Sequence, residues 1–471
     1  MNNMMFKPTD LDQDIDRGLK NEFLRNAMAL LTAFSGGAQR LKIMDEVGGF
    51  ENLRQRARAS KDKVLNRLDY YLEKLEDSVQ KAGGRVVWAD GPQDVIDYIV
   101  SLAREKNVKS VVKGKSMVTE EIDLNPALQR AGLEVLETDL GEYIIQLAGE
   151  RPSHIVGPAL HKTKEEVARL FEEKLGISYT DDPAELTMAA RRVLRESFLQ
   201  ADMGITGANF AVAETGTIVL LENEGNIRLS TTLPRIHVAV MGIEKVVADF
   251  NDLQSLLKVL PISTMNLRLP SYTSFITGPA GSEGEGPEEF HLVLLDDFRT
   301  KILADPDFRQ MLRCIRCGAC LNACPVYGTI GGHAYPWVYS GPMGVVLTAL
   351  AKGPSETKDL LQASTLCRTC AEVCPVMIDL PGMILKLRSQ AVEKASPLLL
   401  KSLAVAARLY STPLGYDSAG RIIKAATKLA LDSEGRIQRG PELIKNMGSN
   451  RRLPQPADVP FHRAVSDEDL K

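Results

Sequence analysis

Seven cysteines lie between residues 314 and 374 of the 471-residue chain, and the rest of the sequence contains none. The stretch CIRCGACLNACP, residues 314–325, has the spacing C-x2-C-x2-C-x3-C-P. In this pattern three thiolates on one tight loop bind a four-iron cubane, and the cysteine before the proline binds a different cluster. A zinc ribbon needs neither the third cysteine nor the proline. The spacing therefore predicts iron–sulfur chemistry.

A second cysteine run, STLCRTCAEVCP at residues 364–375, repeats the motif with Ser364 in place of its first cysteine. An exchange of ligands between the runs, as in two-cluster ferredoxins, predicts two clusters. We expect cluster 1 to be [4Fe-4S], and cluster 2 to be [4Fe-4S] or a labile [3Fe-4S]. The predicted ligands are Cys314, Cys317, Cys320 and Cys374 for cluster 1, and Cys324, Cys367 and Cys370 for cluster 2, with Ser364 at its fourth corner.

Ser364 leaves several states open for that corner. A serine hydroxyl is far from ionised at neutral pH, so it needs the charge of the iron to become a ligand. Water or a nearby side chain could instead take the open iron, or the iron could be lost. The loop between the two runs also contains His333, which is either a ligand or proton carrier, or an ordinary packed histidine.

Two stretches ahead of the cysteines carry candidate binding and catalytic residues. The first, VKGKSMVTEE at residues 112–121, places Lys113, Lys115 and Ser116 after a strand. These residues could hold a carboxylate or a phosphate at a helix N-terminus. The alternative is a solvated loop in which a serine or threonine caps the helix.

The second stretch, AETGTIVLLENEGN at residues 213–226, sets polar residues beside apolar strands. Glu214 and Glu224 are candidate catalytic carboxylates, because burial can raise the pKa of a carboxyl into the range of a general base. Asn226 is a candidate substrate-binding residue, and Arg228 and His237 follow as further catalytic candidates. Arginine suits a carboxylate substrate through its two-pronged donor geometry. Ordinary turn and buried structural roles would explain the same residues.

The elements that must position these residues alternate between strands and helices. One helix is predicted through residues 52–82, ended by Gly83 and Gly84. Alternation of strands and helices then indicates βαβ units and a largely parallel sheet. Strands are predicted at 85–89, 109–114, 133–139, 153–157, 236–242 and 290–297, and two more within 208–226 that meet at residues 214–216 and are followed by a Glu-Gly turn. Helices are predicted at 92–107, 163–176 and 183–204.

Three regions are predicted: an α/β domain with a helical N-terminal extension at 1–298, a ferredoxin-type iron–sulfur domain at 299–390, and a helical, then Pro-rich C-terminal region at 391–471. The helix expected near residues 398–409 is too short and too charged to span a bilayer. It is a core or subunit-contact helix or, alternatively, a membrane-surface helix. At most peripheral membrane contact is therefore expected.

Composition, charge and the absence of certain motifs argue against nucleic-acid binding, secretion and a dinucleotide cofactor. The formal net charge is −4, with 44% hydrophobic and 25% charged residues, so nothing in the bulk charge indicates nucleic-acid binding. The start of the chain is polar and lacks the apolar segment of a secretory signal, which predicts a cytoplasmic protein. No G-x-G-x-x-G motif follows a strand, so no dinucleotide cofactor is indicated.

The sequence resembles the lactate utilisation protein B family, which provides the iron–sulfur component of the bacterial L-lactate-utilisation complex. The stretches that carry the resemblance lie at 213–247, 286–297, 314–348 and 367–378. It implies an α/β Rossmann-like lactate-utilisation domain, related to the NagB/RpiA and CoA-transferase folds, followed by an α-helical two-cluster ferredoxin-like domain and a helical C-terminal tail. Ser364 departs from the family pattern, which has cysteine at this position.

The resemblance also implies a function. The chain would act with two other lactate-utilisation subunits to oxidise L-lactate to pyruvate, which makes it one component of an oxidoreductase. Its ferredoxin module would pass electrons to an unidentified acceptor. Two alternatives remain: a stand-alone enzyme with isomerase- or CoA-transferase-like chemistry and merely structural clusters, and a redox-sensing binding protein.

Overall fold

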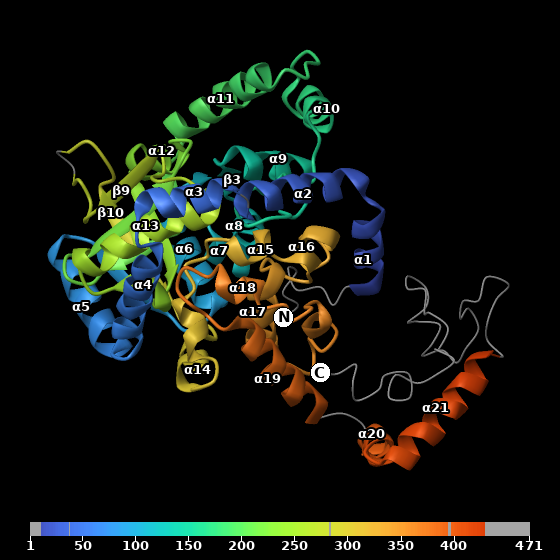
Figure 1. Ribbon diagram of the computed structural model, residues 1–471. Coiled ribbons are helices and arrows are strands. Elements are labelled where there is room, and N and C mark those ends of the chain that lie inside the picture. Colours follow the sequence, from blue (N-terminus) through green and yellow to red (C-terminus); the bar gives the residue numbers. More distant parts are fainter. Residues whose placement is uncertain (1–10, 37, 282–283, 394–396, 429–471) are drawn as a thin grey trace. The chain divides into compact units, whose positions relative to one another are not determined.

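The structure, a computed structural model, describes residues 11–36, 38–281, 284–393 and 397–428 (Figure 1). The chain divides into two compact units after Ala391. The first unit contains the α/β domain and all the cysteines. The predicted boundaries at residues 298 and 390 remain predictions, and the Pro-rich stretch predicted near the C-terminus lies outside the described residues.

The α/β domain is built on a six-stranded, entirely parallel sheet, as the alternation of elements predicts. Its strand order is β1-β10-β7-β4-β2-β3. After β2 the chain continues to β3, towards one edge of the sheet, and after β4 the next strand of this sheet is β7, towards the other edge. The direction in which strands are added therefore reverses between β2 and β4. The strands are β1 Arg85–Ala89, β2 Ser110–Lys113, β3 Glu134–Glu137, β4 Met203–Thr206, β7 Ile236–Gly242 and β10 Glu289–Leu295.

Both faces of this sheet are covered, because successive side chains of a strand point to opposite faces. Val238 and Val240 of β7 pack in one core with helices α6 (Pro92–Glu105) and α8 (Leu124–Arg130). Ala239 and Met241 pack in another core with α5 (Leu68–Lys81) and a second, smaller sheet. Parallel strands buried on both faces explain the nearly continuous apolar sequences of β7 and β10.

The smaller sheet has the order β8-β5-β6-β9 and contains the two strands predicted to meet at residues 214–216. Strands β5 and β6 pair antiparallel, with Phe210 opposite Val219. Strand β9, which the sequence pattern does not predict, extends the sheet beyond β6. The strands are β5 Phe210–Val212, β6 Thr217–Glu222, β8 Val246–Val247 and β9 Tyr272–Ile276.

Three predicted elements differ in the structure. The helix predicted at 183–204 ends earlier, at Gln200, and Met203 and Gly204 belong to strand β4, which the sequence pattern does not predict. The strand predicted at residues 153–157 is wrong: this segment is a series of bends, in which the ring Nδ1 of His154 accepts the backbone N–H groups of Val156 and Gly157, both at 3.0 Å. The single helix predicted through residues 52–82 is two helices, α4 (Phe50–Leu65) and α5. The Arg309 guanidinium donates to the carbonyl of Leu65 at 3.3 Å, where α4 ends.

The remaining helices of the α/β domain connect its strands. Helix α10 begins at the capping residue Thr163 and ends at Gly176, which has the positive φ of 66° that favours glycine. The others lie where the alternation of elements requires crossover connections. The helices are α7 Met117–Glu121, α9 Leu140–Ala148, α10 Lys164–Leu175, α11 Pro183–Gln200, α12 Asn226–Thr232, the 3₁₀ helix η1 Ile243–Lys245 and α13 Phe250–Met265.

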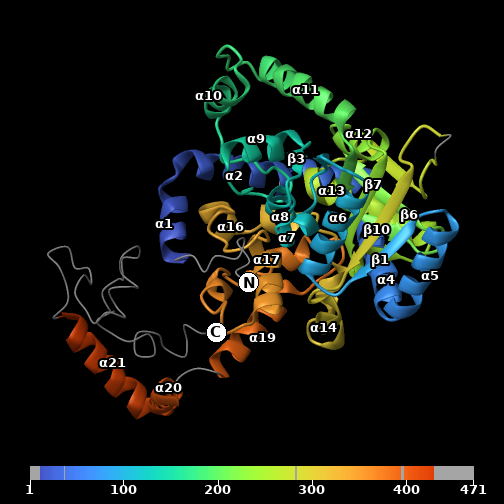
Figure 2. The ribbon, with the colours of Figure 1, turned by 180° about the vertical axis from the view of Figure 1, so that it is seen from behind.

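The cysteine-rich region is helical and shares a core with the N-terminal helices. Leu24 and Met28 of α2 and Phe50 of α4 belong to the same buried cluster as Cys324 and Cys374. In both views helices α16 and α17 lie beside α7 and α8 of the α/β domain (Figures 1 and 2). The helices are α1 Leu11–Lys20, α2 Glu22–Gly36, α3 Ala38–Val47, α14 Arg299–Ala304, η2 Arg309–Arg313, α15 Ala319–Asn322, α16 Pro325–Ile330, α17 Gly341–Lys352, η3 Leu360–Gln362, α18 Thr369–Glu372 and α19 Leu380–Glu393.

The second unit is helical where the structure describes it, as predicted. Helix α20 spans Pro397–Tyr410 and α21 spans Pro413–Lys428. The rings of Tyr410 and Tyr416 meet edge to face, with their centroids 6.1 Å apart. Within the described parts of both units, no helix combines the length and the apolar character that crossing a membrane requires.

Candidate functional site

The backbone of the first cysteine run is repeated in the second. Arg316 and Leu366, at the same place in each run, have φ angles of 60° and 55°. Gly318 and Arg368, also at matching places, have φ angles of 78° and 69° and precede the short helices α15 and α18. Both loops therefore turn in the same way, and Ser364 occupies the structural position of the first cysteine of a cluster loop.

Four cysteines from both runs line one cavity, and they are the four predicted as ligands of cluster 1. Burial first, and then the neighbouring thiols of both runs, raise the pKa of Cys320 well above its ordinary value. Thiols that repel one another's ionisation in this way suit a cationic iron–sulfur core, which binds thiolates. The cysteines lining the cavity are Cys314, Cys317, Cys320 and Cys374.

The other three cysteines form a second group. Burial, and then the thiols of Cys324 and Cys367, raise the pKa of Cys370 to about 12. The backbone N–H of Tyr327 donates to the sulfur of Cys324 at 3.5 Å, as that of Ile378 does to the sulfur of Cys374 at 3.4 Å. Cys367 is exposed, whereas the other two thiols of the group are buried.

At the fourth corner of this group the Ser364 hydroxyl accepts a hydrogen bond from the backbone N–H of Leu366 at 3.2 Å. The backbone carbonyl of Ser364 accepts a hydrogen bond from the Arg388 guanidinium at 2.8 Å. Among the described residues, no three Cys, His, Asp or Glu side chains converge on a point suited to one metal ion. A cubane spreads its ligands over several irons, so both cysteine groups fit a cluster better than a single ion.

A larger cavity, of about 330 Å³, lies at the carboxyl ends of the parallel strands. Lys115 and Ser116 reach it after β2, residues 207–209 after β4, and Lys245 after β7. Open α/β sheets bind ligands at this edge, and at the point where the strand order reverses. Arg316 of the first cysteine loop completes the wall, so the cavity adjoins the cluster 1 ligands.

Four of the sequence-predicted residues line this larger cavity: Lys115, Ser116, Glu224 and Asn226. The Lys115 ammonium lies 3.7 Å from the carboxylate of Glu142 and donates to the carbonyl of Val156 at 3.0 Å. The Ser116 hydroxyl also caps α7 by accepting the N–H of Thr119 at 3.4 Å. Ser116 therefore caps α7 and also lines the cavity, and its role in binding a ligand remains a prediction.

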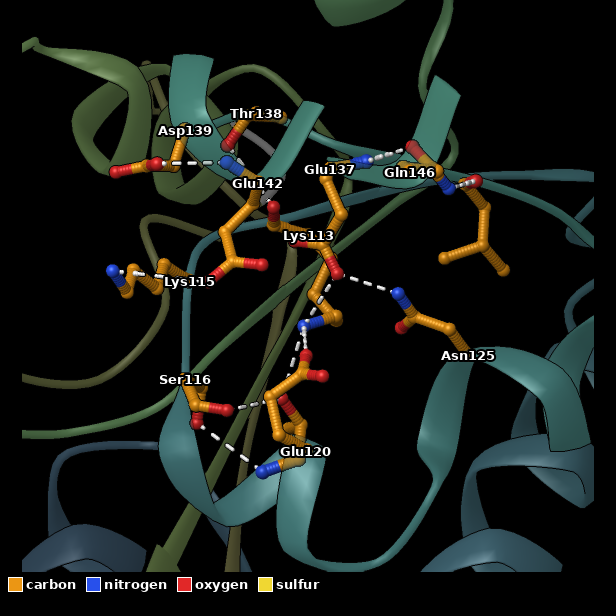
Figure 3. Close-up of polar contacts among 12 residues, drawn as sticks. Lys113, Lys115, Ser116, Glu120, Asn125, Glu137, Thr138, Asp139, Glu142 and Gln146 are labelled. Carbon is orange, nitrogen blue, oxygen red and sulfur yellow. Dashed lines mark hydrogen bonds and ion pairs between the residues drawn. The ribbon is translucent and has the colours of Figure 1, made fainter. Parts of the chain in front are cut away.

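Lys113 lies elsewhere, within a buried ion network (Figure 3). Its ammonium is 2.8 Å from Glu137 and 3.1 Å from Glu120, and it donates to the Thr119 hydroxyl at 3.0 Å. Burial by itself would lower the pKa of Lys113, but the two carboxylates raise it overall. Nearby, burial and then the Glu120 carboxylate raise the pKa of Glu142 to about 8. Lys113 is thus fully engaged with protein groups.

Three other predicted residues lie away from the cavity. Glu214 is exposed at the turn between β5 and β6, and Arg228 is exposed with its guanidinium 5.6 Å from the ring centre of Tyr272. His237 is buried inside the sheet, with its Nε2 2.8 Å from the Thr206 hydroxyl. Burial lowers the pKa of His237 to about 3, so the ring is neutral at pH 7. None of the three is among the residues that line the cavity.

His333 is likewise absent from both cavities. Its Nε2 lies 2.7 Å from the carbonyl oxygen of Arg151, and its ring packs edge to face on His161 at a centroid distance of 4.4 Å. These contacts favour the interpretation of His333 as a packed histidine.

A buried charged network that the sequence pattern does not predict joins the α/β domain to the cysteine region. Arg299 donates to both carboxylate oxygens of Glu121, at 3.0 and 3.1 Å, and to Glu244 at 2.7 Å. Glu244 also lies 3.5 Å from Arg316, and the Tyr339 hydroxyl donates to Glu121 at 2.6 Å. The sequence contained one indication of this network: Arg316 lies between Cys314 and Cys317, within the cluster motif.

Replacing Arg299 with methionine should destabilise the protein by about 3–5 kcal/mol, because the buried carboxylates of Glu121 and Glu244 both lose their ion pair with this guanidinium. The measurement is urea unfolding of anaerobically prepared protein. Lys301→Met is the matched control, since Lys301 is exposed on the same helix and the substitution removes the same charge. Equal unfolding midpoints for the two variants would show that the network contributes little to stability.

Two family models match separate parts of the chain. The model of the LUD domain family matches residues 72–295, and that of the 4Fe-4S dicluster domain matches residues 310–378. The chain is 46% identical to the uncharacterized electron transport protein YkgF of Escherichia coli K12, over 82% of this chain and 81% of that protein.

Two relatives named lactate utilization protein B align along almost their whole length. The one from Bacillus licheniformis is 44% identical, over 96% of this chain and 95% of the relative. The one from Geobacillus thermodenitrificans is 43% identical, over 95% and 94%. With this identity sustained from end to end, the chain belongs to the lactate utilization protein B family.

Proposed function

We propose that this chain is the iron–sulfur electron-transfer subunit of a complex that oxidises L-lactate to pyruvate and so allows growth on lactate. One observation carries the proposal: the stretch that matches a 4Fe-4S dicluster domain gathers its seven cysteines into two groups, one beside a cavity of the lactate-utilisation domain. Two other lactate-utilisation subunits and a separate electron acceptor complete the system. The proposal places the chain in the cytoplasm, where thiols stay reduced.

The residues of this chain hold and insulate the electron carriers. Cys314, Cys317, Cys320 and Cys374 would hold cluster 1, and the other three cysteines cluster 2. When bound, each cluster supplies a one-electron store. Backbone N–H groups donate to Cys324 and Cys374, which stabilises the thiolate form of both.

The two ligand groups differ in their exposure. The cluster 1 cysteines line a cavity within the protein, next to the wall residue Arg316 of the larger cavity. Cys367 of the second group is exposed. This asymmetry favours electron entry on the side of the larger cavity and exit near Cys367, where an acceptor can approach.

Lactate-dependent dye reduction tests the proposal against its two alternatives. The chain and its two partner subunits are purified anaerobically, and turnover is measured for the assembled complex and for the chain alone. We expect about seven to eight irons per chain, because each motif is typical of a four-iron cluster and cluster 2 can lose one iron. We expect turnover only in the assembled complex. Turnover by the isolated chain would favour a stand-alone enzyme. Absence of turnover in both, with partner affinity that changes on cluster oxidation, would favour a sensor.

A further inference from the structure

We propose that the larger cavity binds a small 2-hydroxycarboxylate, with Lys245 and Arg316 anchoring its carboxylate. This inference rests on the proposed function for the identity of the anion as L-lactate. The cavity walls come from the parallel sheet on one side and from the first cysteine loop on the other. A ligand held there would lie between the two domains that the proposed function connects.

Arg316 supplies an unused hydrogen-bond donor. Its side chain is 10% exposed, lies 3.5 Å from Glu244 through Nη2, and stacks 5.0 Å from the ring centre of Tyr339. Its other terminal nitrogen, Nη1, is buried and has no hydrogen-bond partner among the described residues. A buried donor without a partner is costly, and a bound carboxylate would supply the acceptor.

Lys245 is the second cation of the wall. It follows β7 in the short helix η1, is 6% exposed, and lines the cavity. Among the described residues, the nearby Glu244 carboxylate makes its ion pairs with Arg299 and Arg316, and none is formed with the Lys245 ammonium group. Buried lysines are normally paired, so an anion in the cavity would provide the missing charge.

The carboxylates of the cavity wall are committed to backbone groups. Glu222 accepts two N–H groups at the start of α12, at 2.7 and 2.9 Å. Asp139 caps α9 at 3.1 Å, and Glu224 accepts the N–H of Leu140 at 3.1 Å. These acids already accept hydrogen bonds from backbone N–H groups. Among the described residues, the groups of the wall that lack a hydrogen-bond or ion-pair partner are donors, and this favours an anionic ligand.

The remaining wall matches the other parts of a 2-hydroxy acid. Ser116 and Asn226 offer hydrogen-bonding groups for a hydroxyl, and Leu260 and Ile315 offer an apolar surface for a methyl group. Gly207 is required for this shape, because a Cβ there would lie 2.7 Å from the Ser116 hydroxyl oxygen. The volume of about 330 Å³ is ample for a three-carbon acid.

The competing explanation is that the two cations only balance the negative charge of the cluster 1 thiolates. The Cys314 thiol lies close enough to act on both Arg316 and Lys245. Arg316 lines both cavities, whereas Lys245 lines only the larger one and not the one formed by the cysteines. The two explanations predict different measurements, because charge balance changes the reduction potential of the cluster without requiring any ligand.

Equilibrium dialysis of the full chain with its clusters, under anaerobic conditions, tests the site with labelled L-lactate and with the uncharged isostere L-lactamide. We expect L-lactate to bind and L-lactamide not to compete. Lys245→Gln and Arg316→Gln should each raise the Kd for L-lactate about tenfold or more, the effect of losing one charge-assisted hydrogen bond. Lys258→Gln is the matched control, because Lys258 is exposed on α13 and absent from the wall.

Iron content separates a binding defect from a damaged cluster. If Arg316→Gln loses iron, the test rests on the Kd of Lys245→Gln for L-lactate, because Lys245 lies outside the cysteine loops. The proposal is overturned if wild-type protein binds no lactate, if L-lactamide competes equally, or if Lys245→Gln retains wild-type affinity while only the cluster potential falls. Any of these results, obtained with intact clusters and with lactate turnover by the complex, would leave the proposed electron-transfer function standing.

Discussion

Replacing Cys374 with alanine is expected to destroy cluster 1, although Cys374 belongs to the second cysteine run. Its thiol lines the same cavity as the three first-run cysteines. Arg54 fixes the Cys374 backbone by donating two hydrogen bonds to its carbonyl, at 3.0 and 2.9 Å. The iron content of anaerobically purified protein should fall by about four atoms per chain, the content of one cubane. Iron analysis with electron paramagnetic resonance measures this.

Cys370→Ala is the matched control for that experiment. It removes a buried thiol from the same run, but one grouped with Cys324 and Cys367. We expect it to damage cluster 2 and to leave the cluster 1 spectrum intact. If Cys374→Ala instead kept cluster 1 and lost only cluster 2, the exchange of ligands between the two runs would be refuted.

Replacing Ser364 with cysteine is expected to make cluster 2 resistant to oxidation. In the wild type, mild oxidation should produce a three-iron signal, because one iron of cluster 2 has no thiolate ligand. The Ser364 hydroxyl accepts a backbone hydrogen bond within its own turn, and the neighbouring Cys367 is exposed. Both features favour a labile corner. The measurement is electron paramagnetic resonance before and after oxidation of the anaerobic protein.

Ser364→Ala provides the control for the role of the hydroxyl. If the corner is open, the alanine variant should oxidise as readily as the wild type, and only the cysteine variant should suppress the three-iron signal. Identical oxidation-resistant four-iron spectra in the wild type and Ser364→Cys would instead identify Ser364 as a true ligand.

The sequence by itself determined the local features of this protein. The cluster motif is readable because three ligands of a cubane must lie within a few residues on one loop, so that their spacing carries the information. The strands of the parallel sheet are readable because burial on both faces requires apolar runs, as in residues 236–242 and 290–297. The helix cap at Ser116 also depends only on its immediate neighbours.

The tertiary structure alone decided which of these residues meet. Lys113 and Lys115 stand two positions apart on the same segment, yet Lys113 lies in a buried ion network and Lys115 on the cavity wall, because the strand ends at Lys113 and the chain turns after it. Arg316 and Lys245 come from different domains and share that wall because the carboxyl ends of the strands face the first cysteine loop. Spacing along a chain cannot encode such contacts, since they depend on how separate elements pack.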